Sequence, residues 1–171
     1  MEYKHELPIM SMDTTETNCC PRFEPEIWDE KIFELTNLPM VRAATRSFFY
    51  VPLNMAKVMT KTMNQILEQG AATTDKYLIL SEDISPWKCN NYFLVQKPVK
   101  GLENVSFSGN FYTKVFEGDF KEIPDWIAVL KKSMERQDLK IGRILSFYTT
   151  CPKCAKIYGK NYIVLFGEVV Q

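Results

Sequence analysis

The sequence predicts an α+β fold made of two strand-helix-strand-strand modules in a pseudo-two-fold arrangement. In each half, a predicted strand ends in an aromatic residue and a turn, and Glu117 follows its counterpart Tyr50 by 67 residues. Each turn leads into an amphipathic helix, and two further strands follow each helix. Because neither module is long enough to bury a core alone, we expect the two to pack together, with a ligand cleft at their seam.

The composition is typical of one soluble domain. The 171 residues are 46% hydrophobic and 13% aromatic, and the formal net charge is zero. A neutral chain is unsuited to partners held mainly by charge, so we expect no nucleic-acid and no membrane partner. No apolar run approaches the roughly 20 residues of a membrane helix, and the polar N-terminus lacks the apolar core of a secretion signal. We therefore predict a cytoplasmic protein with a flexible tail at residues 1–20 and a single domain at residues 21–171.

The first predicted module covers residues 38–98. The content of Phe, Ile, Leu and Val predicts strands at residues 31–34 and 40–50. After a helix, strands at about residues 76–80 and 92–96 complete the module.

The helix of this module is the clearest element in the sequence. Asn54 suits the position that caps its start, and Gly70 suits its end. The apolar residues that recur at helical spacing are Met55, Val58, Met59, Met63, Ile66 and Leu67.

The second predicted module covers residues 104–170. It begins with a strand at residues 105–116 and ends with strands at about residues 143–149 and 161–169. Between them lies a helix in which Pro124 fits only the first turn. The apolar face of that helix consists of Ile123, Trp126, Ile127, Leu130 and Met134.

Several short motifs resemble a known family. The turn Glu117-Gly118-Asp119-Phe120, followed by a helix with Trp126, resembles the Gly-Pro-Tyr turn and helix of GyrI-like small-molecule-binding domains, a resemblance that covers residues 38–170. A stand-alone subfamily, the cyclopropanoid cyclopropyl hydrolases, resembles this chain more specifically. The motifs concerned are Arg46-Ser47-Phe48-Phe49, Ser85-Pro86-Trp87, Cys151-Pro152-Lys153-Cys154 and Tyr158-Gly159-Lys160-Asn161-Tyr162.

The resemblance implies a fold and a ligand. The fold would be a curved antiparallel sheet with the helices on one side and a ligand cleft between the modules. The ligand would be a small, electrophilic aromatic molecule, because members of the subfamily open the cyclopropane ring of DNA-alkylating natural products of the yatakemycin and duocarmycin type. Cation-binding members of the wider family carry an acidic residue where this chain has Ser146. A site without that carboxylate is better suited to a neutral aromatic ligand.

Two carboxylates are candidates for activating the water that would open such a ring. Glu117 is the first choice because it ends the leading strand of the second module, although an exposed turn carboxylate explains it equally well. Glu168, on the last strand, is the second candidate.

Tyrosines are candidates for donating a hydrogen bond to the oxygen that becomes a phenolate. Tyr112 and Tyr148 are the catalytic candidates, and Tyr50 and Tyr162 are ligand-binding candidates. We expect two of the four to reach the cleft.

Two further aromatic residues are predicted to bind the ligand. Trp87 lies in a loop between strands, where a large ring has no core position; the alternative is that it anchors the loop. Phe49 ends the leading strand of the first module, with Phe48 pointing to the opposite face. Trp126, by contrast, is predicted to be core.

The remaining chemistry-bearing residues predict no cofactor and no metal. The five cysteines are an odd number in a chain without an export signal, so reduced thiols are expected. Cys151 and Cys154 have metal-ligand spacing, but the only other pair, Cys19 and Cys20, is adjacent in sequence, so we interpret the motif as a structured turn linking two strands. The only histidine, His5, lies in the predicted tail, which excludes a histidine-based nucleophile system in the domain.

The sequence therefore predicts a hydrolase that adds water to cyclopropane-bearing genotoxic molecules. The alternative is a non-catalytic protein that sequesters or senses small aromatic molecules. The oligomeric state stays open.

Overall fold

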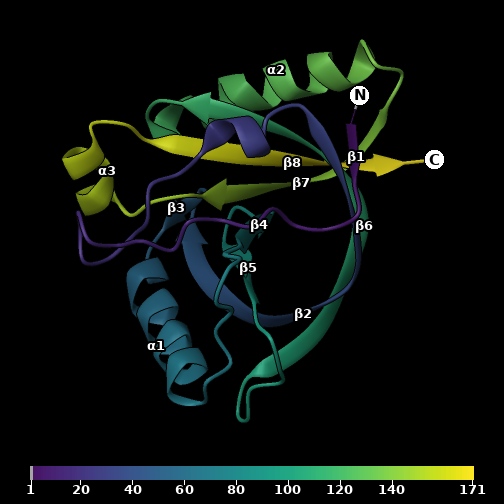
Figure 1. Cartoon of the computed structure of the whole chain (residues 1–171). Helices are drawn as coiled ribbons and strands as arrows, with labels where there is room; N and C mark the ends of the chain where they lie inside the picture. The colour runs from purple at the N-terminus through teal and green to yellow at the C-terminus, as the bar shows by residue number, and fades with distance from the viewer. Residues whose placement is uncertain (1) are drawn as a thin grey trace. The chain divides into compact units, whose positions relative to one another are not determined.

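The computed structural model describes residues 2–171 and divides into two compact units (Figure 1). Unit 1 contains the residues up to Leu35 together with Gly109–Gln171, and unit 2 contains Thr36–Ser108. Two long strands belong to both units: β2 (Lys31–Phe48) crosses the boundary after Leu35, and β6 (Glu103–Glu117) crosses the boundary after Ser108. In the described part of the chain, no helix is both long enough and apolar enough to span a bilayer.

Unit 2 is built on an antiparallel sheet. Residues 40–46 of β2 pair with β5 (Lys88–Leu94), and β5 pairs in turn with β4 (Ile79–Ser85). The short strand β3 (Val51–Pro52) folds back on the end of β2. The predicted loop at Ser85-Pro86-Trp87 is therefore the turn of the β4–β5 hairpin.

Helix α1 (Met55–Glu68) supplies the helical part of the core of unit 2. Asn54 precedes the helix as predicted, but its side chain accepts a hydrogen bond from the backbone N–H of Arg46 at 2.7 Å instead of capping α1. Gly70 follows the helix with a φ of 62°, a left-handed conformation in which glycine is unstrained. The buried core residues are Val41, Ile66, Ala71, Ile79, Phe93, Val95 and Val99.

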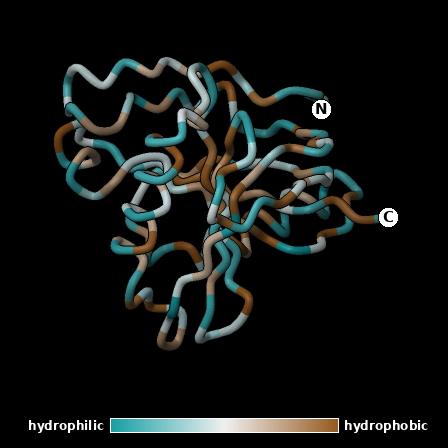
Figure 2. Tube along the Cα trace, turned by 90° about the horizontal axis from the view of Figure 1, so that it is seen from below, coloured by the Kyte–Doolittle hydropathy of each residue, from teal (hydrophilic) through white to brown (hydrophobic). Residues whose placement is uncertain are grey.

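The long strands of unit 1 also pair antiparallel, with β8 (Tyr162–Val170) pairing with both β6 and β7 (Lys140–Tyr148). The short strand β1 (Glu2–Lys4) pairs in parallel with the start of β2. Strand β8 is buried from Ile163 to Gly167, and the hydrophobic stretch just before the C-terminal residue is visible in Figure 2.

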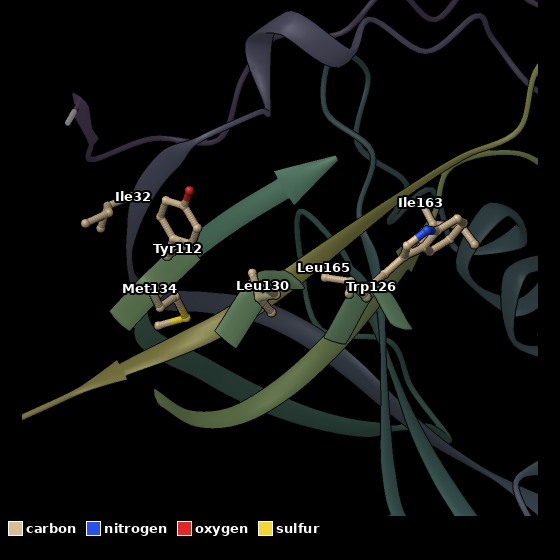
Figure 3. Close-up of a cluster of buried hydrophobic side chains, with 7 residues drawn as sticks. All are labelled: Ile32, Tyr112, Trp126, Leu130, Met134, Ile163 and Leu165. Carbon is tan, nitrogen blue, oxygen red and sulfur yellow. The ribbon is translucent and has the colours of Figure 1, made fainter. Parts of the chain in front are cut away.

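Helix α2 (Ile123–Glu135) packs on one face of these strands, and Figure 3 draws the buried side chains of this cluster. A capping box in the preceding 3₁₀ turn (Phe120–Glu122) joins Asp119 and Glu122 and satisfies backbone donors of this turn, which leads directly into the helix. Trp126 stacks on Phe116 with ring centroids 5.2 Å apart, which confirms its predicted core position. The buried residues of this cluster are Ile32, Tyr112, Trp126, Leu130, Met134, Ile163 and Leu165.

Aromatic residues form a further cluster in unit 1. Trp28, next to the 3₁₀ turn Pro25–Ile27, is fully buried and lies 5.5 Å from Phe147 and 5.9 Å from Phe166, centroid to centroid. Phe23 adds a ring 6.3 Å from Trp28. The segment before β2 is therefore part of the core of unit 1.

In unit 2, β3 lies between β2 and α1, and β5 pairs with both β2 and β4. In unit 1, a further helix lies between β7 and β8, and β8 pairs with both β6 and β7. The pseudo-two-fold relation of the two modules stays a prediction.

Three details differ from the sequence prediction. The two predicted strands at residues 31–34 and 40–50 are one continuous strand as far as Phe48, although Thr36-Asn37-Leu38-Pro39 has the composition of a turn. The segment predicted to be a turn between two strands opens a short helix, α3 (Pro152–Tyr158), so that prediction was wrong. Residues 2–20, for which a tail was predicted, include β1 and the buried side chains of Leu7 and Met10, whose wide spacing shows no periodicity.

Candidate functional site

Three aromatic side chains of unit 2 pack against one another while staying exposed to solvent. They are Phe48, Phe49 and Trp87, here called the aromatic cluster. Ring centroids lie 4.8 Å apart for Phe49 and Trp87, 5.5 Å for Phe48 and Trp87, and 4.9 Å for the two phenylalanines. Their exposed fractions are 56%, 62% and 51%. A group of exposed apolar rings of this kind is typical of a surface that binds a ligand or a partner.

Two hairpins hold the aromatic cluster together. Strand β2 turns back into β3 through Phe49 and Tyr50, and Trp87 lies in the turn between β4 and β5. The backbone N–H of Ser47 donates to the carbonyl of Trp87 at 2.8 Å, and that of Tyr50 donates to the carbonyl of Pro86 at 3.0 Å. Backbone hydrogen bonds therefore fix the turns on which all three rings are carried.

The backbone of the first turn is strained. Phe49 and Tyr50 have φ values of 46° and 67°, the left-handed region that a two-residue hairpin turn requires. Asparagine and glycine are the usual residues there, since other L-residues lose about 1–2 kcal/mol each. Large rings at two such positions oppose the local preference, and strain of this kind clusters at functional sites.

The structure brings together two of the residues that the sequence singled out. Phe49 and Trp87 are in contact, and Tyr50 is 58% exposed in the same turn. Phe48 was expected to point away from Phe49, because side chains alternate along a strand. The strand ends at Phe48, so the alternation stops there and both rings reach Trp87.

A second group of predicted residues lies at one end of the sheet of unit 1. Glu117 ends β6 and pairs in register with Tyr162 at the start of β8, while Tyr148 ends β7 opposite Ile163. Glu117 is exposed, and its carboxylate lies 3.6 Å from the ammonium of Lys160. Of the three predicted residues at this end, Tyr148 is exposed and Tyr162 is half-buried.

A small pocket opens at this end of unit 1. Its volume is about 120 Å³, and the Nζ atom of Lys160 lies 5.8 Å from the ring centroid of Tyr162. The Tyr162 side chain and the charge of Glu117 raise the pKa of Lys160, so this ammonium stays charged. The buried Thr150 hydroxyl has no hydrogen-bond partner among the described residues. The residues that line the pocket are Arg22, Phe23, Thr150, Tyr158, Lys160 and Tyr162.

Two predicted residues lie elsewhere. Tyr112 is fully buried beneath α2, and its hydroxyl is 2.9 Å from that of Ser133, so this side chain has no access to a ligand (Figure 3). Glu168 binds the guanidinium of Arg143 at 3.1 Å, six residues along β8 from Tyr162, which is about 20 Å of strand. Neither residue joins Glu117.

A larger surface hollow, of about 660 Å³, lies along α1. None of the predicted site residues lines it. Its walls come from one face of a single helix and carry no aromatic ring, so we do not assign a ligand site to it. The lining residues are Ala56, Lys57, Thr60, Lys61, Asn64, Gln65 and Glu68.

Four cysteines of unit 1 converge on one point. The sulfur atoms of Cys19, Cys20, Cys151 and Cys154 all lie within 4.8 Å of one another, an arrangement that could hold a metal ion. Burial raises the pKa of the Cys20 thiol well above its usual value. Burial also acts to raise that of Cys154, but hydrogen bonds from Cys151 and from the backbone of Cys20 bring the pKa of this thiol down to about 7.

The convergence of these four thiols was not predicted from the sequence. The two pairs are separated by more than 130 residues, and only the Cys-x-x-Cys spacing of the second pair signals it.

Comparison with known proteins identifies the family. A family model described as bacterial hydrolase matches residues 10–169, which is nearly the whole chain. The chain belongs to this bacterial hydrolase family. No curated protein sequence matches it significantly.

Solved structures were also compared with this chain. The structure of SAV2435 bound to tetraphenylphosphonium has a TM-score of 0.52 at 9% identity, covering 83% of this chain and 94% of SAV2435. A putative bacterial transcription regulation protein from Staphylococcus aureus MU50 has a TM-score of 0.46 at 9% identity, covering 84% and 99%. The first likeness supports the GyrI-like fold that the sequence motifs predict.

Proposed function

We propose that this protein binds flat aromatic molecules at the aromatic cluster and that it is a hydrolase. The observation that carries the proposal is the packing of Phe48, Phe49 and Trp87 at the surface of unit 2, with each ring more than half exposed. A stacked ligand ring gains about 0.5–1.5 kcal/mol per aromatic contact beyond its buried area. The match to a hydrolase family supports the chemical half of the proposal.

The substrate that we propose carries a cyclopropane fused to a conjugated dienone, as in the yatakemycin and duocarmycin alkylators. Water adds to the strained carbon, a base takes up one of its protons, and the ring bond that breaks leaves its electron pair on the dienone, which becomes a phenolate. The protonated base or solvent then returns a proton to the phenolate oxygen, giving the phenol. Relief of strain and gain of aromaticity favour this step, so the protein needs only to position water, accept a proton and polarise a carbonyl. Such a reaction would protect the cell from genotoxic molecules.

For the base we propose Glu117. Its carboxylate is exposed to water and lies 3.6 Å from the ammonium of Lys160. Tyr148 and Tyr162, at the same end of the unit 1 sheet, remain candidates for the hydrogen bond to the developing phenolate. Tyr112 is no longer a candidate because it is fully buried.

Binding without turnover is the second candidate function. The observation that favours it is the likeness in fold to SAV2435, whose structure holds tetraphenylphosphonium, an aromatic cation. Because this chain has Ser146 where cation-binding members carry an acidic residue, we propose that its own ligand is aromatic but neutral. A protein that stacks aromatic rings and releases them unchanged would sequester toxic molecules without hydrolysing them.

One experiment separates the two functions. The purified protein is incubated with a spirocyclopropyl-cyclohexadienone alkylator, and the products are followed by mass spectrometry against a control without protein. Addition of one water over many turnovers supports hydrolysis, whereas protection of the intact molecule at a stoichiometric ratio supports sequestration. Loss of the substrate at the uncatalysed rate, with no bound ligand, would overturn both.

A further inference from the structure

We propose that Cys19, Cys20, Cys151 and Cys154 bind one structural Zn²⁺ ion. The four sulfur atoms lie within 4.8 Å of one another and come from two segments of unit 1 that are far apart in sequence. Four thiolates that converge on one point form a common closed zinc site in proteins. The proposal is independent of the hydrolase function.

The spacing of the sulfur atoms fits a tetrahedral ion. With a Zn–S bond of about 2.3 Å, two ligands of a regular tetrahedron lie about 3.8 Å apart. Cys19 Sγ lies 3.6 Å from Cys20 Sγ and 3.9 Å from Cys151 Sγ. A disulfide would need about 2.05 Å, so the thiols are spaced for a shared metal more closely than for a bond to one another.

The second pair is presented by the start of α3. Cys151 is the residue before the helix, with extended backbone at φ −71° and ψ 159°, and Pro152 occupies the first helical position. Cys154 follows in the first turn of the helix and is fully buried. This is the two-residue spacing of a metal knuckle, with both sulfur atoms on the same side of the turn.

The adjacent pair can share one ion because its backbone is bent. Asn18 has a left-handed φ of 53°, and the hydroxyl of Thr17 accepts the backbone N–H groups of Cys19 at 3.2 Å and Cys20 at 3.1 Å. In an extended chain the two side chains would point to opposite sides. Here the turn places both side chains on the same side. Their adjacency in sequence, which argued against a shared metal, therefore does not prevent the two sulfur atoms from binding one ion.

Hydrogen bonds outside the four ligands support the arrangement. The backbone N–H of Cys151 points at Cys20 Sγ at 3.5 Å, which helps a thiolate there. The hydroxyl of Tyr158 donates to the carbonyl of Cys20, so the last turn of α3 holds the first pair in place. Partners of this kind orient the ligands of metal sites.

Ligand type and number define the role of the site. Zn²⁺ would displace four thiol protons to solvent and form a complex with a net charge of −2, which Lys153 and Lys156 of α3 are available to offset in part. All four positions are filled by protein, and no position remains for water or substrate, so the ion would be structural.

The first test is cobalt binding by the wild-type protein. Metal is removed with a chelator under reducing conditions, and Co²⁺ is titrated in. We expect saturation at one ion per chain, with the intense visible bands of tetrahedral Co²⁺ and thiolate charge transfer, and displacement by Zn²⁺. Absence of these bands in a folded protein with all five thiols reduced would overturn the proposal.

Variants identify the ligands. Cys20→Ser and Cys154→Ser should each abolish tight zinc binding, whereas the matched control Cys89→Ser should retain it, because Cys89 lies on β5 and is outside the cluster. Undiminished zinc binding by both cluster variants would contradict the assignment.

A thiol-protection measurement remains informative where a variant does not fold. In the wild-type protein, Zn²⁺ should slow the alkylation of Cys19, Cys20, Cys151 and Cys154 relative to the metal-free protein, as read by peptide mass spectrometry, whereas Cys89, which is buried outside the cluster, should react at the same rate in both. Protection of Cys89 alone, or a disulfide within the cluster that forms equally fast with Zn²⁺ present, would overturn the proposal.

Discussion

At the scale of single residues, Trp87 is the side chain through which the binding proposal is tested most directly. Its indole touches both phenylalanines of the aromatic cluster and is half-exposed. We expect Trp87→Ala to weaken binding of an aromatic ligand by at least about 0.5–1.5 kcal/mol, which is about 2- to 13-fold in Kd. Fluorescence or calorimetric titration measures this change.

The matched control is Phe120→Ala. Phe120 is 60% exposed but lies in the 3₁₀ turn before α2, outside the aromatic cluster. Its removal should leave the Kd unchanged. Equal losses in both variants would mean that the ligand responds to general surface hydrophobicity and not to the cluster.

Glu117 is the residue that we propose as the base in the hydrolysis step. Replacing it by glutamine keeps the size of the side chain but removes the base, so we expect Glu117→Gln to lower kcat by about 10²- to 10⁴-fold with little effect on KM. Steady-state kinetics with the alkylator measures both constants. An exposed glutamate on α2, Glu135, provides the control, and an unchanged kcat in Glu117→Gln would assign the base to another group.

At the scale of elements, the turn between β6 and α2 tolerates little change. A Cβ atom on Gly118 would collide with the Glu122 carboxylate and would lie 2.9 Å from the Trp126 ring, and Gly118 has a φ of 149°. We expect Gly118→Ala to lower the free energy of unfolding by about 1–3 kcal/mol. Chemical denaturation measures it, with Gly101→Ala as a control in which φ is also positive but no atom lies within 4 Å of the added Cβ. An equal loss of unfolding free energy in both variants would indicate that the positive φ, and not the collision with Glu122 and Trp126, destabilises Gly118→Ala.

The sequence predicts helices and hairpins better than it predicts contacts between segments that are far apart in the chain. The periodicity around Met59 and Trp126 and the turn at Pro86 are local signals, and α1, α2 and the turn occur as predicted. The strands on either side of the turn were predicted at about residues 76–80 and 92–96 but extend up to it, as β4 at Ile79–Ser85 and β5 at Lys88–Leu94. Helix α3 was missed because seven residues show less than two helical periods, with a proline at the first position.

The same difference between local signals and long-range contacts applies to the candidate site residues. Phe49 and Trp87 were selected for their local context and are in contact, whereas Tyr112 was selected by type alone and is in the core. Strand alternation cannot say which face of a sheet a helix will cover. The pairing of Cys19 and Cys20 with Cys151 and Cys154 depends on tertiary folding, which no spacing rule for one segment detects.

At the scale of the whole molecule, a structural zinc ion would couple metal content to stability. Binding to the folded state only adds a free energy that grows with the logarithm of the metal concentration over Kd, about 4 kcal/mol at a thousandfold excess. We therefore expect a strong chelator to lower the Tm of the wild-type protein and not that of Cys154→Ser. Calorimetry measures both values, and an identical Tm with and without chelator in a wild-type protein known to contain zinc would contradict the stabilising role.

At the left-handed turn of Phe49 and Tyr50, selection for thermal stability and selection for ligand binding should favour different residues. An Asn-Gly pair would relax this backbone and should raise the thermal stability of unit 2, while it removes one ring of the aromatic cluster. A library randomised at these two positions and screened for heat resistance should converge on Asn-Gly. The same library screened for survival in the presence of an aromatic toxin should keep large rings there, so the two enriched pools would diverge at a single turn.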